Sequence, residues 1–345
     1  MKTALVLGGA GFIGGHMARH LVKNGYWVSC VDIKNDFSRI DENGGYEFDG
    51  PHSFTTGDLS NRDVVKKIMH NNGEQYDEIY QFAADMGGAG YIFTGDNDAN
   101  VMHNSATINL NVLDEMVKMK EDKRSNYKNT KIFYSSSACI YPEHNQKDPD
   151  NPECSENSAY PANPDSEYGW EKLFSERLYL SYNRNYGIPV RIARYHNIFG
   201  PYGTWNGGRE KSPAAICRKV AMAENNGQIE IWGDGNQTRS FLYIDECIEA
   251  TYRLMQSDFT GPVNIGSEEM VTINKLVDIV CNIAEKNLEK VHVDGPTGVR
   301  GRNSNNDLIR EKLGWDYSMS LQEGLARTYR WINDQVIRNK QNLDN

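Results

Sequence analysis

The sequence predicts an α/β protein built on a doubly wound parallel sheet, with a smaller mixed α/β lobe towards its C-terminal end. Three observations carry this prediction. Short apolar runs alternate with helical stretches through the first half of the chain, a glycine-rich turn follows the first run, and the alternation changes to helices, short strands and turns after about residue 200. Alternating strands and helices are typical of a parallel sheet with helices on both faces.

Six apolar runs in the first half have the length and composition of buried strands. They are Thr3–Leu7, Trp27–Asp32, Ser53–Thr56, Glu78–Phe82, Lys131–Ser136 and Pro189–Tyr195. The helical stretches between them are Phe12–Asn24, Arg62–His70, Ala106–Met119 and Tyr168–Tyr186. The segments Lys34–Pro51 and Asp148–Asp165 are expected to be surface loops. We predict a first domain over residues 1–200.

The remaining residues, 201–345, predict a second lobe that returns some segments to the first domain. Its expected helices are Pro213–Glu224, Asp245–Gln256, Ile273–Ala284 and Leu321–Val336, with Gly/Pro turns between them. Apolar residues recur at helical spacing in the third of these helices, which indicates one buried face.

Composition and charge bound the class of protein. Apolar residues make up 39% and charged residues 24% of the 345 residues, as in ordinary globular enzymes. No stretch approaches the roughly 20 apolar residues of a membrane span, and the first apolar run is too short for a signal-peptide core. The net charge of -10 argues against nucleic acid as a partner. The six cysteines lack metal-ligand spacing, so we expect free thiols, no metal and a cytoplasmic protein.

The turn after the first strand reads Gly8-Gly9-Ala10-Gly11-Phe12-Ile13-Gly14. Between a strand and a helix, such a turn lets the backbone approach a pyrophosphate, and the helix N-terminus offers its free N–H groups. Asp32 ends the next strand, about 20 residues on, where an acid binds a ribose 2′-hydroxyl and repels a 2′-phosphate. The pattern therefore predicts a Rossmann-type domain that binds NAD in preference to NADP. A later acid, Asp58, either caps the adenine pocket or caps the next helix.

Tyr168 and Lys172 are four residues apart and share one helix face. Together with the glycine motif and Ser135-Ser136-Ser137 at a strand end, they make the sequence resemble the extended short-chain dehydrogenase/reductase family. Longer motifs make it similar to the GDP-mannose 3,5-epimerase family over nearly the whole chain. These motifs are Ala83–Gly90, Ser136–Pro142, His196–Pro201, Gly207–Lys211, Trp232–Ser240 and Gly298–Ser304.

The resemblance implies an isomerase that epimerises GDP-mannose at carbons 3 and 5, through a ketone at carbon 4, to GDP-L-galactose and GDP-L-gulose. The ketone makes the protons on both neighbouring carbons removable, and NAD takes the hydride and returns it. Tyr168 would be the base for the carbon-4 hydroxyl, with Ser137 sharing the hydrogen bond to the sugar oxygen. Free tyrosine titrates near 10, and a cation about 4 Å away is worth up to about 4 kcal/mol, so we expect Lys172 to lower the pKa of Tyr168.

The resemblance also implies that Cys139 and Lys211 are the acid/base pair on the two faces of the sugar ring. In an extended segment Cys139 would face the same way as Ser137, two residues earlier. A nearby cation favours the reactive thiolate, whereas most buried cysteines are structural. Lys211 follows a glycine-rich stretch, and its ammonium is an acid at neutral pH. An ordinary solvated lysine is the other interpretation.

Basic residues gather in the second half, and arginine suits diphosphate oxygens. The resemblance places the GDP-sugar at Gly87, Gly88, Ser137, Ala138, Cys139, Asn197, Glu210, Lys211, Lys219, Gln237, Arg239 and Arg302. The residues expected to contact NAD are Gly8, Gly11, Phe12, Ile13, Gly14, Asp32, Asp58, Leu59, Ala83, Tyr168 and Lys172.

Three alternatives remain. An epimerase-reductase resembling GDP-fucose synthase would consume NADPH and pair the cysteine with a histidine, and both Asp32 and Lys211 argue against it. A relative acting at carbons 3 and 5, or at carbon 5, of another GDP-linked manno-configured sugar would carry the same residues. A dinucleotide-binding sensor or scaffold usually lacks the catalytic tyrosine or lysine, whereas this sequence has both Tyr168 and Lys172. The family's habit of pairing through two sheet-flanking helices implies a homodimer.

Overall fold

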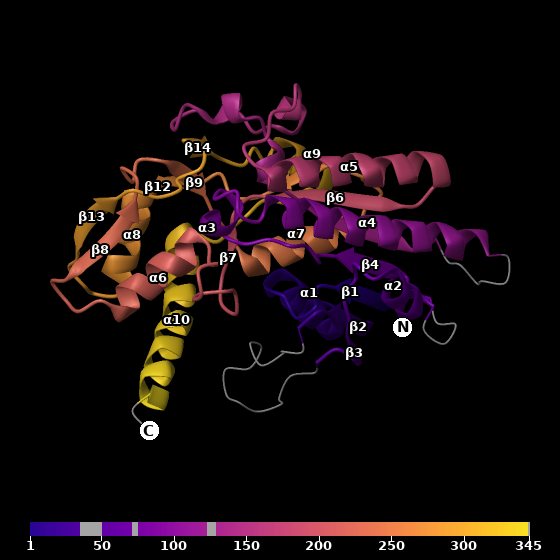
Figure 1. Cartoon of the computed structure of the whole chain (residues 1–345), viewed down its shortest axis with the longest axis horizontal. Coiled ribbons are helices and arrows are strands. Elements are labelled where there is room, and N and C mark those ends of the chain that lie inside the picture. Colours follow the sequence, from indigo (N-terminus) through magenta and orange to yellow (C-terminus); the bar gives the residue numbers. More distant parts are fainter. Residues whose placement is uncertain (35–49, 71–74, 123–128, 344–345) are drawn as a thin grey trace.

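The central sheet of the computed structural model has seven strands in the order β11-β6-β5-β4-β1-β2-β3, and every neighbouring pair is parallel (Figure 1). The structure describes residues 1–34, 50–70, 75–122 and 129–343, so most of the predicted loop Lys34–Pro51 lies outside the described residues. The strand order reverses between β1 and β4, which is the crevice where doubly wound sheets bind their ligands. The predicted fold class is confirmed.

The six predicted strands are all present, with ends that differ by one residue at most. They are β1 (Thr3–Leu7), β2 (Trp27–Asp32), β3 (Ser53–Thr56), β4 (Glu78–Gln81), β5 (Lys131–Ser137) and β6 (Val190–Tyr195). The seventh strand, β11 (Val263–Ile265), comes from the second half of the chain and pairs with β6. At three residues it is too short for a periodicity to show in the sequence.

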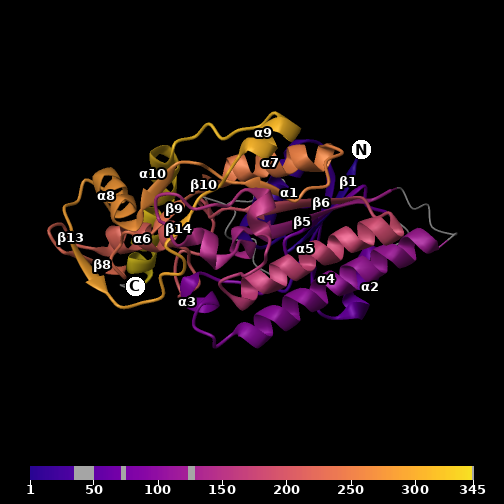
Figure 2. The ribbon, with the colours of Figure 1, turned by 90° about the horizontal axis from the view of Figure 1, so that it is seen from above.

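Helices cover both faces of this sheet (Figure 2). One face carries α1 (Phe12–Lys23) and α7 (Ile244–Gln256), and the other carries α2 (Arg62–Met69), α4 (Asp98–Glu121) and α5 (Glu167–Tyr186). Strand β1 shows why both faces are covered. Ala4 and Val6 belong to the apolar cluster with α1 and α7, whereas Leu5 and Leu7 belong to the cluster with α2, α4 and α5. A strand that alternates between two apolar faces needs a helix layer on each.

The second lobe lies at one end of the sheet (Figure 1). Its small sheets are β12-β9-β14 and β13-β8, and its helices are α6 (Ser212–Met222), α8 (Ile273–Ile283) and α10 (Leu321–Leu343). The strands are β8 (Gln228–Trp232), β9 (Thr238–Ser240), β12 (Met270–Thr272), β13 (Glu289–Val293) and β14 (Gly301–Arg302). Four short elements link the parts: α3 (Ala89–Ile92), β7 (Ile198–Phe199), β10 (Leu242–Tyr243) and α9 (Asp307–Leu313).

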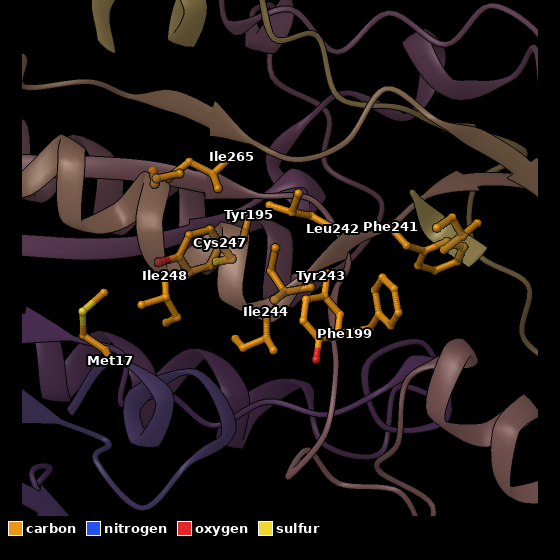
Figure 3. Close-up of a cluster of buried hydrophobic side chains, with 14 of the residues drawn as sticks. Met17, Tyr195, Phe199, Phe241, Leu242, Tyr243, Ile244, Cys247, Ile248 and Ile265 are labelled. Carbon is orange, nitrogen blue, oxygen red and sulfur yellow. The ribbon is translucent and has the colours of Figure 1, made fainter. Parts of the chain in front are cut away.

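A single apolar cluster joins the lobe to the sheet (Figure 3). It runs from Met17 of α1 and Ile248 of α7, past Tyr195 and Ile265 at the sheet, to Phe241 beside the lobe. Because the two parts share this core, the carboxyl ends of the strands are held against the lobe. The predicted division at residue 200 stays a prediction. None of the helices in the described part of the chain has the length and apolarity that crossing a bilayer requires.

Candidate active site

The turn between β1 and α1 forms a narrow cradle of backbone. Gly11 is the N-cap of α1, and no side chain caps the first N–H groups of this helix. A Cβ at Gly14 would lie 2.1 Å from the carbonyl oxygen of Gly8, so only glycine lets the helix approach the turn this closely. The uncapped N–H groups and the positive end of the helix dipole fit a pyrophosphate.

Asp32, at the end of β2, borders this cradle with a fixed carboxylate. Its Oδ2 accepts a hydrogen bond from the backbone N–H of Ala10 at 3.1 Å, and its Oδ1 accepts one from that of Lys34 at 3.0 Å. The acid is therefore oriented beside the turn, and its contact with the ribose of a dinucleotide stays a prediction. The cradle and this acid together fit NAD.

The sequence left two interpretations of Asp58, and the one in which it caps the following helix, α2, is wrong. The N-cap of α2 is Asn61, whose side chain accepts from the N–H of Asp63 at 2.9 Å. Asp58 is exposed and accepts from the N–H of Ser60. Its contact with adenine, and those of buried Leu59 and of Ala83 beyond β4, stay predictions.

Tyr168 lies at the start of α5 beside the end of β5. A Cβ at Gly169 would lie 2.2 Å from the carbonyl oxygen of Cys139, so the glycine lets α5 pack directly on that segment. Tyr168 is 7% exposed and forms a hydrogen bond with Ser137. The structure therefore brings together Tyr168, Ser137 and Cys139, as the sequence predicted.

Lys172 is buried behind the tyrosine. Its Nζ lies 5.6 Å from the centre of the Tyr168 ring and donates to the carbonyl oxygen of Ser135 at 3.1 Å. Burial lowers the pKa of Lys172, and the charge of Glu171 partly offsets this. Burial raises the pKa of Tyr168, as does the charge of Cys139. Among the protein's own groups, burial is the largest influence on this pKa and the net shift is upward. The predicted lowering of the Tyr168 pKa, by Lys172 together with the positive nicotinamide of NAD, stays a prediction.

Cys139 reaches the site by a different backbone path from the one predicted. Residues Ala138–Ile140 form a short 3₁₀ turn instead of an extended segment, so the alternation argument for Ser137 and Cys139 is wrong. The turn is capped by Ser137, whose hydroxyl accepts from the N–H of Cys139 at 3.2 Å. The thiol is half-buried and interacts electrostatically with both Tyr168 and Lys211. The result is a thiol at the site, next to the tyrosine.

Arg302 holds this thiol, a contact that the sequence did not reveal. Its Nη1 donates to the Sγ of Cys139 at 3.1 Å, its Nε to Gln146 at 2.5 Å, and its Nη2 to Asp165 at 3.1 Å. Arg302 is 4% exposed, and burial alone would lower the pKa of its guanidinium, but Cys139 and Asp165 raise it. The three hydrogen bonds fix the guanidinium against the sulfur and so hold the thiol in the site. The predicted contact of Arg302 with the diphosphate stays a prediction.

Lys211 ends the glycine-rich loop and is the N-cap of α6. Lys211 is exposed at the protein surface. The surrounding protein still removes enough water from its ammonium to lower the pKa of Lys211. The charge of Cys139 raises that pKa and so offsets part of the effect. The structure thus brings Lys211 towards Cys139, although 72 positions separate them in the sequence (211 − 139).

Gln237 and Arg239, two of the predicted substrate residues, lie just before β9 and within it, and both could bind a polar ligand. Gln237 is 5% exposed, and its Oε1 has no partner among the described residues. Arg239 donates to the carbonyl oxygens of Thr238, Thr297 and Val299. Burial, together with the charge of Arg302, lowers the pKa of Arg239 to about 9. This partly buried cation, whose hydrogen bonds go to carbonyl oxygens, would be stabilised by an added anion.

The other predicted substrate residues are engaged within the protein. Asn197 donates to the carbonyl oxygen of Ser240 and Lys219 to that of Glu230. Glu210 accepts from the N–H of Gly208 and from Arg218. Gly87 and Gly88 are buried beside the loop that carries Glu210. Contacts of these residues with a nucleotide sugar stay predictions.

Comparisons with known proteins identify the family and the fold. The sequence model of the NAD dependent epimerase/dehydratase family matches residues 4–266. The chain is 44% identical to GDP-mannose 3,5-epimerase of Arabidopsis thaliana, over 97% of this chain and 83% of that protein. It is 30% identical to the putative UDP-glucose 4-epimerase of Methanocaldococcus jannaschii, over 96% and 98%. The UDP-glucose 4-epimerase of Thermotoga maritima, solved with UDP-glucose, superposes with a TM-score of 0.82 at 24% identity, covering 97% of this chain and 99% of that one.

Proposed function

The chain belongs to the NAD-dependent epimerase/dehydratase family, and from that premise we propose that it epimerises a GDP-linked sugar, GDP-mannose, at carbons 3 and 5. The observation that carries the proposal is the convergence of a tyrosine, a thiol and a lysine on one site, with Arg302 donating to the thiol at 3.1 Å. The 44% identical relative named GDP-mannose 3,5-epimerase supports the same reaction.

The residues divide the reaction between them. The cradle from Gly8 to Gly14, with Asp32, would hold NAD, which would supply reversible hydride transfer at carbon 4. Tyr168 takes the proton of the carbon-4 hydroxyl, while Ser137 holds the oxygen. The charge of Lys172, together with that of the bound nicotinamide, would offset the effect of burial on the tyrosine. Cys139, whose sulfur accepts a hydrogen bond from Arg302, removes the proton next to the ketone. Lys211 delivers a proton to the opposite face, which inverts the carbon.

The cation arrangement supports this proposal over an epimerase-reductase. An epimerase-reductase would pair its cysteine with a histidine. Among the described residues, the cations that interact with the Cys139 thiol are instead lysines and arginines, with Lys211 and Arg302 among them. Asp32 disfavours the 2′-phosphate that NADPH carries. At the nucleotide end, Gln237 and Arg239 offer an unpartnered carbonyl and a weakly compensated cation to the GDP moiety. A cytoplasmic location is part of the proposal, and the six unpaired cysteines support it.

The test is incubation with GDP-mannose in heavy water without added cofactor. We expect deuterium at carbons 3 and 5 of the recovered sugars, measured by mass spectrometry and NMR. Exchange requires the transient ketone, and turnover without added cofactor requires NAD that is regenerated in place. Bound substrate without deuterium at either carbon would contradict the proposal.

We also propose a homodimer that forms through α4 and α5. These helices pack side by side on one face of the sheet (Figure 2) and expose four large apolar side chains, Met102, Leu110, Trp170 and Phe174. Large apolar side chains exposed on two neighbouring helices are typical of a protein contact. Introducing a buried charge should separate the subunits, so we expect Phe174→Glu to convert the dimer to a monomer in light scattering. Ile337→Glu, on exposed α10, is the matched control and should stay dimeric. An unchanged mass for Phe174→Glu would reject this interface.

A further inference from the structure

The loop that delivers Lys211 has little secondary structure of its own. Residues 207–210 lie outside any helix or strand, and Gly207 and Gly208 have φ angles of +94° and +83°. Within the loop, Glu210 accepts from the N–H of Gly208 at 2.7 Å. Such a segment does not place an acid group accurately by itself, so contacts with other elements have to hold it.

The loop is held across the site by Tyr91 of α3, which lies between the sheet and the second lobe (Figure 1). The guanidinium of Arg209 lies over the Tyr91 ring, 4.0 Å from its centre. Next to this stack, the N–H of Gly88 donates to the carbonyl oxygen of Arg209 at 3.0 Å. A cation over an aromatic face is attracted by the ring quadrupole and also packs flat upon it.

Tyr91 is anchored in turn to the first domain. Its hydroxyl donates to Oδ1 of Asp85 at 2.8 Å, and Oδ2 of the same acid accepts from Asn104 of α4 at 3.0 Å. The N–H of Asp85 donates to the hydroxyl of Ser105, also on α4, at 3.1 Å. A continuous path of contacts therefore runs from α4 through Asp85 and Tyr91 to Arg209. We call this path the Tyr91 bridge.

We propose that Tyr91 is a positioning residue for Lys211, acting through the Tyr91 bridge on the loop two residues before the lysine. This inference rests on the proposed function. Removing the ring takes away the stack on the Arg209 side chain. The loop then keeps its hydrogen bonds with Gly88 and Arg218 but is placed less accurately, and the lysine moves away from the sugar. Cys139 is held separately by Arg302 and keeps its place, so proton removal continues while delivery to the opposite face fails.

This division gives a signature that a merely structural role of Tyr91 does not produce. The thiol can remove a proton from a ring carbon and return a solvent deuterium to the same face of that carbon. The recovered substrate is then labelled, but the carbon is not inverted. For Tyr91→Leu in heavy water with GDP-mannose, we expect epimer formation to fall roughly 10- to 100-fold, as for a displacement of about 1 Å. Deuterium uptake into recovered substrate should fall much less, so the ratio of exchange to inversion rises.

Companion variants keep this test decisive. Tyr91→Phe retains the ring and should lie between wild type and Tyr91→Leu, and Arg209→Ala removes the other half of the stack from an exposed loop and should raise the same ratio. In a Lys211→Ala background, Tyr91→Leu should have little further effect on inversion. Arg253→Ala, an exposed partner of Glu249 on α7, should leave the ratio unchanged.

A parallel fall of exchange and inversion in Tyr91→Leu and Arg209→Ala, or unchanged inversion in both, would overturn this role for Tyr91. A full additional loss from Tyr91→Leu in the Lys211→Ala background would overturn it as well. Wild-type protein that binds GDP-mannose and exchanges no proton would instead reject the proposed function, and this role with it.

Discussion

Tyr168→Phe is expected to abolish turnover almost completely, lowering kcat roughly 10²- to 10⁴-fold. The substitution keeps the ring, which is 7% exposed and packs with Ile92 and Val101, so the fold and the binding of substrate should persist. It removes the oxygen that takes the carbon-4 proton. Without that step no ketone forms, and both epimer formation and deuterium uptake should stop together.

The pH profile separates this role from a structural one. Burial raises the pKa of Tyr168, so acid protonates this base at a higher pH than it would an exposed tyrosine. Burial lowers the pKa of Lys172, so alkali removes the lysine charge at a lower pH than usual. Wild type should therefore lose kcat on both sides of an optimum, and the residual activity of Tyr168→Phe should lack the decline on the acid side.

Tyr160→Phe is the matched control for this substitution. Tyr160 is half exposed, lies outside the site and contacts Arg177, so its kcat and pH profile should match those of wild type. Retention of wild-type kcat by Tyr168→Phe would remove the tyrosine from the reaction and with it the proposed ketone.

Cys139→Ala is expected to separate oxidation from epimerisation. The variant keeps Tyr168, Ser137 and Lys172, so the carbon-4 ketone should still form and be detectable by mass spectrometry of the trapped sugar. It lacks the thiol that removes the neighbouring proton, and epimer formation should fall roughly 10²- to 10⁴-fold. Deuterium uptake should fall with it, in contrast to the Tyr91→Leu variant, which retains the thiol.

Cys281→Ala, in α8 of the second lobe, controls for the loss of a cysteine and should keep both activities. Cys139→Ser should resemble Cys139→Ala, because a serine hydroxyl next to Arg302 does not ionise as a thiol does. Wild-type epimerisation by Cys139→Ala would show that another group removes the proton, and Lys211 would then be the first candidate.

Much of the site follows from local sequence patterns. The glycine turn ahead of α1 and the acid ending β2 lie within one strand-helix-strand unit, so their spacing alone predicts the cofactor cradle. Tyr168 and Lys172 are one helical turn apart, which places both on the same face of α5. These predictions succeed because each depends on backbone geometry that repeats every few residues.

The contacts that tune the chemistry do not repeat and were not predicted. The 3₁₀ turn at Cys139 breaks the alternation on which its predicted orientation rested. Burial raises the pKa of Tyr168, a sign that depends on the packing of elements far apart in the chain. Arg302 meets Cys139 across 163 positions, and Arg209 meets Tyr91 across 118 (209 − 91).

The sequence by itself therefore determined the sheet, the cradle and the choice of candidate reacting groups, because strand and helix periodicity and short motifs are local properties. The tertiary structure decided which cation holds the thiol, where the lysine loop rests and how the tyrosine titrates. Those outcomes depend on distance and burial between segments that only the folded chain brings together.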